Sequence, residues 1–181
     1  MTLNYKLEEE DYHTHLLFTI SKSSSAIKTR NRIRYLMTIS LILFAVMAYG
    51  NHSIGQTIYF SALAILAFFF MPLYTRWSYR KTYLKHVRNY YKDRLSEPTT
   101  ITFKSDVLLI SDSQGNSQVD ITELEEINEL ENYYFLKVKS GQSIIIPKLK
   151  IDNKEELTST LKELSQNQSI TWNDETTWIW K

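Results

Sequence analysis

The chain has 181 residues, with 21 basic and 20 acidic side chains and a net charge of +1. It has no cysteine, which excludes a disulfide scaffold and a cysteine nucleophile, and its 4 Gly and 3 Pro are too few for a collagen-like or low-complexity chain. The near-zero charge conceals a polarised chain. Residues 1–27 and 97–181 are acidic, residues 28–34 and 76–96 are strongly basic, and residues 35–75 carry no charge.

Residues 1–27 are predicted to form an N-terminal cytoplasmic segment with one helix over residues 7–20. Acidic residues crowd the first turn of this helix, where the helix dipole favours them, and a serine run follows its end. Apolar side chains recur at four-residue spacing: Tyr12, Leu16 and Ile20. His13 and His15 are two positions apart and point in different directions on a helix, so we expect no metal site here.

The uncharged block of residues 35–75 is long enough for two membrane spans, because one spanning helix needs about 20 apolar residues. We expect spans at Tyr35–Tyr49 and Ile54–Tyr74, joined by a tight turn at Gly50–Ser53. A signal peptide is disfavoured because the block begins only after 34 residues and a second apolar run follows at once. The alternative is a buried helical hairpin of a soluble protein.

Basic residues flank this block on both sides and extend the predicted membrane unit to residues 28–96. The candidate membrane-surface residues are Lys28, Arg30, Arg32, Arg34, Arg76, Arg80, Lys81, Lys85, Arg88 and Lys92. Short basic segments stay on the cytoplasmic side, and the connecting turn has no Lys or Arg. Both termini should therefore be cytoplasmic, with the chain in the inner (cytoplasmic) membrane of a bacterium.

The second span should continue as a helix to about Leu95. Four bases form a row along it at spacings of four, three and four: Lys81, Lys85, Arg88 and Lys92. Such a row is suited to contact with anionic headgroups. The alternative is a topology signal on a solvated helix face. We expect no nucleic-acid partner, because the acidic remainder of the cytoplasmic part would repel phosphates.

Residues 97–168 change to a strand-type pattern and are predicted to form a small antiparallel domain. Strands are expected at 99–103, 107–111, 133–139 and 143–147. Gly115-Asn116 is a hairpin signal, and Asp152 is predicted to cap a final helix with Glu155 at the capping-box position. The fold class is therefore α+β: a two-helix transmembrane hairpin followed by a small antiparallel β-rich domain with a C-terminal helix.

Three stretches carry a resemblance to a known family. They are Tyr5–Leu16 (YKLEEEDYHTHL), the hairpin with its basic flanks, and Ile121–Leu164, which contains ITELEEINELENYYFLKVKSGQSIIIPK and the helix from Asn153. In these the chain resembles the YcxB-like bacterial membrane proteins, which pair a two-helix membrane hairpin with a domain similar to a pleckstrin-homology (PH) fold. A Trp commonly stands where this chain has Ile121, which suits a core position equally. The resemblance implies a membrane-tethered PH-like domain and no reaction.

Residues 169–181 hold three of the four tryptophans, Trp172, Trp178 and Trp180. We expect a terminal hairpin or strand in which Trp172 faces one of the others across an Asn-Asp-Glu-Thr-Thr loop. A hairpin this short is marginal alone and should dock. Two surfaces remain open: the chain's own sheet, or a partner or the membrane interface, where Trp is favoured.

The sequence has no phosphate-binding glycine loop, nucleophile elbow or zinc motif. The glutamates of residues 123–131 are spaced as on a solvated face, with no histidine nearby. We therefore expect no catalytic, cofactor or metal site and a protein that is not an enzyme. Two functions fit: a binding module at the inner membrane face that recognises a protein partner or a lipid headgroup, or an immunity or envelope-defence protein against a membrane-acting toxin.

Overall fold

The computed structural model describes residues 1–95, 97–113 and 115–180, which divide into two compact units. The first unit combines Met1–His15 with Leu84–Ile179, and the second combines Leu16–Tyr83 with Trp180. We describe each unit by itself. Helix α1 (Glu9–Lys22) begins in the first unit and ends in the second, which is close to the helix predicted over residues 7–20.

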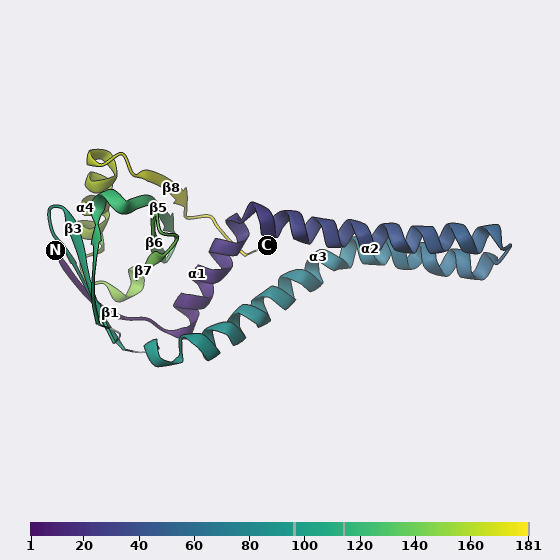
Figure 1. The fold of residues 1–181 in the computed structure, drawn as a ribbon, viewed down its shortest axis with the longest axis horizontal. Coiled ribbons are helices and arrows are strands. Elements are labelled where there is room, and N and C mark those ends of the chain that lie inside the picture. The colour runs from purple at the N-terminus through teal and green to yellow at the C-terminus, as the bar shows by residue number, and fades with distance from the viewer. Residues whose placement is uncertain (96, 114, 181) are drawn as a thin grey trace. The chain divides into compact units, whose positions relative to one another are not determined.

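The second unit is a helical hairpin of α2 (Ser24–Gly50) and α3 (Ile54–Tyr90). Ser23 caps α2 by accepting a hydrogen bond from the backbone NH of Ala26. The turn lies at the predicted place, and His52 adopts a left-handed φ of 55° in it. The two helices run side by side (Figure 1). Phe44 packs on Phe60 with ring centroids 5.6 Å apart, and the buried small residues are Ala45, Ala48 and Ala64.

Both helices are long and apolar enough to cross a membrane. Only 11% of the most apolar stretch of α2 and 6% of that of α3 is buried. Large apolar side chains that stay exposed include Leu43, Val46, Met47, Ile58, Ile65 and Phe69. The soluble alternative requires these faces to be covered by protein, and the described part of the chain does not cover them.

The first unit contains two four-stranded sheets. One sheet has the order β1-β2-β3-β4 and is antiparallel throughout. Its strands are β1 (Thr2–Lys6), β2 (Pro98–Phe103), β3 (Val107–Asp112) and β4 (Gly115–Asp120). The predicted β3–β4 hairpin is present and closes at the Asp112–Gly115 pair. Gly115 opens β4 with a φ of 131°, a conformation that favours glycine.

The other sheet has the order β7-β6-β5-β8 and mixes antiparallel with parallel pairing. Its strands are β5 (Leu124–Leu130), β6 (Tyr133–Val138), β7 (Ser143–Pro147) and β8 (Thr171–Glu175). Helix α4 (Lys154–Asn167) connects β7 to β8 through a short 3-10 turn, η3 (Lys148–Lys150). The α+β class predicted from the sequence is confirmed.

The core of the first unit comes from buried residues of both sheets and one face of α4. Its fully buried side chains include Ile101, Leu108, Ile127, Phe135, Leu157 and Leu161. Ile121 is 1% exposed, so it does occupy a core position. The sequence spacing of Leu157 and Leu161 placed them on one helix face, and both are buried because a four-residue step returns to the same side of a helix.

Three local predictions need correction. The N-cap of α4 is Asn153, whose side chain donates to Glu156, and Asp152 lies outside the helix. Of the two forms predicted for the terminal segment, the strand is present and the hairpin is not, because Thr171–Glu175 pairs in parallel with β5, with Trp172 opposite Ile127. The N-terminal segment, expected to contain only a helix, also supplies β1, which pairs with β2 along its full length.

Candidate functional site

The predicted membrane-surface bases lie on the hairpin helices at the ends away from the turn. Lys28, Arg30, Arg32 and Arg34 are in α2, Arg76 to Arg88 are in α3, and Lys92 is in η1 (Lys92–Arg94). Most of these side chains are exposed, whereas Arg30 and Arg34 are half-buried. Each base near an anionic surface contributes about 1 kcal/mol to attraction. The geometry fits this role, and the membrane contact itself stays a prediction.

Arg88 differs from the other bases because it is held by an acid. Its Nε donates to both carboxylate oxygens of Glu9 at 2.9 Å, and Nη2 lies 2.8 Å from Oε1. This hydrogen bonding lowers the pKa of Glu9 and raises that of Arg88. The pair ties the start of α1 to the end of α3, so Arg88 has a structural partner as well as its predicted membrane role.

A buried carboxylate fixes the start of α1 against the β7-β6-β5-β8 sheet. Asp11 is 3% exposed and accepts hydrogen bonds from Lys150 Nζ at 2.8 Å and from the Tyr133 hydroxyl at 3.0 Å. The backbone NH of Glu8 also donates to it at 2.7 Å. Burial, followed by the charge of Asp11, raises the pKa of Tyr133 well above its usual value. The acidic first turn of α1, interpreted from the sequence as a dipole effect, therefore also makes a tertiary contact.

The tryptophans fall into two groups. On β8, the Trp172 ring lies 6.0 Å from that of Tyr134, with Lys162 Nζ 5.9 Å above it, so this tryptophan docks on the chain's own sheet. Trp178 is half-buried just beyond β8. Trp180 belongs to the second unit, where it is 9% exposed and its Nε1 donates to the backbone carbonyl of Arg76 at 3.3 Å. A partner-binding role for any of the three stays a prediction.

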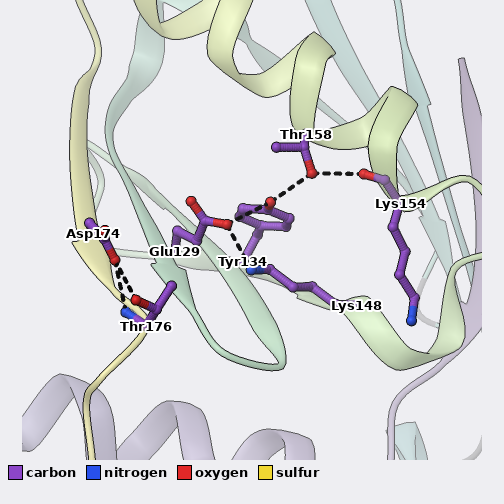
Figure 2. Close-up of polar contacts among 7 residues, drawn as sticks. All are labelled: Glu129, Tyr134, Lys148, Lys154, Thr158, Asp174 and Thr176. Atoms are coloured by element: carbon purple, nitrogen blue, oxygen red, sulfur yellow. Dashed lines mark hydrogen bonds and ion pairs between the residues drawn. The ribbon is translucent and has the colours of Figure 1, made fainter.

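A polar cluster joins β5, β6, η3 and α4 (Figure 2). The Tyr134 hydroxyl lies 3.0 Å from Glu129 Oε1 and 2.9 Å from Thr158 Oγ1. Lys148 Nζ donates to the same Glu129 oxygen at 2.8 Å and sits 4.3 Å from the centre of the Tyr134 ring. Burial raises the pKa of Tyr134 to about 12, so this phenol stays protonated at neutral pH.

This cluster corrects one sequence interpretation. The glutamates of residues 123–131 were expected on a solvated face, but Glu129 has a side chain only 18% exposed and a direct cation partner. Glu125 and Glu126 both pair with Lys137, at 3.1 and 3.2 Å. Within the part of the chain that the structure describes, no group of three or more His, Cys, Asp or Glu is placed to hold a metal ion.

Together these features define a small α+β domain into which an apolar helical hairpin with basic ends is inserted. The family model described as YcxB-like protein matches residues 108–164, from β3 to α4. The chain therefore carries a YcxB-like domain, and the resemblance noted in Ile121–Leu164 is confirmed. No curated protein and no solved structure matches the chain.

Proposed function

We propose that the protein is a non-catalytic binding module that a two-span hairpin anchors at the cytoplasmic face of the bacterial inner membrane. The module is the YcxB-like domain, and we propose that its two sheets and final helix are PH-like. Its ligand would be a protein partner or a lipid headgroup. Support comes from the exposed apolar hairpin and its basic ends.

The exposed apolar hairpin carries the anchoring argument, and one further observation constrains its topology: β1 precedes the hairpin in sequence and β2 follows it, yet the two strands pair residue by residue. The register runs from Thr2 opposite Thr102 to Lys6 opposite Pro98. A sheet cannot form across a bilayer, since unpaired backbone groups are not tolerated in hydrocarbon. The chain between them must therefore cross the membrane an even number of times, which two spans satisfy.

The charges that flank the hairpin indicate on which side of the membrane the domain lies. All the bases of residues 28–34 and 76–96 lie at the ends away from the turn, and residues 50–53 carry no Lys or Arg. Basic flanks are retained in the cytoplasm. The domain, formed from sequence on both sides of the hairpin, is accordingly cytoplasmic in this proposal.

Single-cysteine labelling tests the arrangement directly, because the native chain has no cysteine. Three exposed positions are changed one at a time: Glu10→Cys before the hairpin, Asn51→Cys in its turn and Ser140→Cys in the domain. In intact spheroplasts a membrane-impermeant maleimide should label only the turn variant, and permeabilisation should expose the other two. Labelling of the first and third positions from opposite sides would overturn the proposal, as would labelling of both in intact spheroplasts.

A further inference from the structure

The hairpin has an open groove of about 550 Å³ along one side of the α2–α3 contact. Thr38, Ile42 and Tyr49 line it from α2, and Thr57, Ala64 and Phe68 line it from α3. The two threonine hydroxyls are already used, since Thr38 donates to the carbonyl of Arg34 and Thr57 to that of Ser53. The groove therefore offers an apolar surface to whatever fills it.

The length of the groove fits one leaflet of a bilayer. Thr38 and Tyr49 are eleven positions apart on α2, which corresponds to about 16 Å along the helix axis. Half of the hydrocarbon thickness of a bilayer is about 15 Å. An apolar chain that enters at the Thr38 end could lie along the groove for the depth of a single leaflet.

A cationic side chain, that of Arg34, lies at the Thr38 end of the groove. Arg34 is one helical turn before Thr38, and its guanidinium carbon lies 3.8 Å from the centre of the Phe68 ring, which lines the groove. The Nε of Arg34 is buried and has no hydrogen-bond partner among the described residues. The guanidinium carries a charge and no described residue gives it an acceptor, so an acceptor from outside the chain would stabilise it; because Nε is covered, that acceptor would approach the terminal nitrogens. Phosphate oxygens match a guanidinium especially well.

We propose that this groove binds an anionic phospholipid of the cytoplasmic leaflet, with the phosphate on Arg34 and one acyl chain along the groove. The inference rests on the proposed anchoring of the hairpin in the membrane. Free phosphate would satisfy Arg34 but would leave the apolar groove open. A second copy of the hairpin would fill the groove with apolar side chains, but residues 16–83 contain no Asp or Glu to pair with the guanidinium. A phospholipid satisfies both parts of the site, and Arg30, one helical turn before Arg34 on α2, disfavours a headgroup that carries its own cation, so the anionic class is preferred.

Two matched pairs of variants test the two parts. Arg34→Gln removes the guanidinium, and Arg32→Gln removes an equal charge from an exposed position that points elsewhere on α2. Ser61→Leu fills the groove at an exposed lining position, and Ala62→Leu adds the same bulk at the next exposed position, which does not line it. Arg32, Ser61 and Ala62 are exposed, whereas Arg34 contacts the Phe68 ring of α3, so a thermal unfolding measurement on each variant checks that the hairpin remains folded.

The full chain is purified in mild detergent, and its binding of phosphatidylglycerol and phosphatidylcholine is titrated by native mass spectrometry, with inorganic phosphate as a separate arm. Phosphatidylglycerol should bind the native chain, Arg32→Gln and Ala62→Leu alike. Arg34→Gln should weaken that binding about tenfold, as expected for loss of a charge-assisted contact, and Ser61→Leu should abolish it. Inorganic phosphate alone should neither bind nor compete.

Three results would overturn the inference: equal binding by Arg34→Gln and Arg32→Gln, equal affinity for the two lipids, or competition by inorganic phosphate. A fourth is a fall from dimer to monomer mass in Ser61→Leu with lipid binding unchanged, since it would assign the groove to a second copy. The measurement is made in detergent and does not depend on which side the domain occupies. Its failure would therefore leave the cysteine-labelling result intact, and reversed labelling would not change the lipid preference.

Discussion

Leu3 on β1 is 3% exposed, and its backbone pairs with Ile101, which is fully buried. Leu3→Ala removes three buried carbon atoms, for which the transfer term alone is about 2.4 kcal/mol at about 0.8 kcal/mol per carbon. The cavity that remains adds to this loss, so we expect the domain to lose about 3 kcal/mol of its free energy of unfolding. A domain of this size has about 5–15 kcal/mol in total, so the change is large.

The control is Leu149→Ala, which makes the same chemical change at a leucine of the same unit that is 70% exposed. We expect its effect to be within about 0.5 kcal/mol. Pulse proteolysis of the full chain in urea would measure both, and Leu3→Ala should lower the midpoint by roughly 1–2 M more than the control. Equal midpoints would mean that β1 contributes nothing to the domain, and the argument for an even number of membrane crossings would fail with it.

Three further predictions concern the same domain. Burial lowers the pKa of His15 to about 4. Between this value and about 6.5, the unfolded chain therefore binds more protons than the folded chain. The free energy of unfolding should fall by up to about 3 kcal/mol as the pH drops through this window. His15→Gln should flatten that dependence in urea titrations at several pH values, and an unchanged slope would contradict the assignment. Asp11→Asn should cost about 2 kcal/mol because it leaves the Lys150 ammonium without its buried partner, and Lys150→Met in the same chain should recover part of that loss in a double-mutant cycle. Gly141→Ala should cost about 1 kcal/mol by thermal unfolding because Gly141 has a φ of 87°, whereas no change would show that the turn relaxes.

The hairpin could be predicted because its signal is local. An uncharged block of 41 residues, interrupted only by a turn-forming Gly-Asn pair, defines two apolar helices without reference to the rest of the chain. The same holds for α4, whose leucine spacing defines its buried face by itself. Both signals depend on the periodicity of a single element, which a sequence records directly.

Strand pairing between segments far apart in the sequence was not predicted, because the local pattern of a strand does not indicate which other strand it pairs with. Leu3, Tyr5 and Leu7 alternate in sequence and are all buried, so a period-two signal for β1 was present. It was missed because five residues before a helix also fit an irregular segment. β8 shows the same limit: its tryptophan pattern fits a hairpin equally well, and only the free edge of β5 makes the parallel pairing available.

The polar contacts were the least predictable part of the site. Glu129 pairs with Lys148, and Asp11 pairs with Lys150, only because the fold places η3 beside β5 and the start of α1. In the sequence these acids resemble their solvated neighbours, since charge spacing alone does not distinguish a buried partner from water. The sequence likewise does not show that the Nε of Arg34 is buried without a hydrogen-bond partner, because this depends on the position of the Phe68 ring over the guanidinium.

In the proposed topology, the position of the hairpin between β1 and β2 in the sequence links membrane insertion to folding of the domain. More than 90 residues separate Lys6 from Pro98 along the chain, so closing this loop as a flexible coil would cost several times the thermal energy. An antiparallel helical hairpin reduces that cost, because it returns the chain to the membrane face from which it entered. The five-residue strand β1 then needs to find its partner only over the short segments outside the helices. In that topology the first sheet is completed once both spans are in place, and we expect a chain with one failed span to present an incomplete and therefore degradable domain.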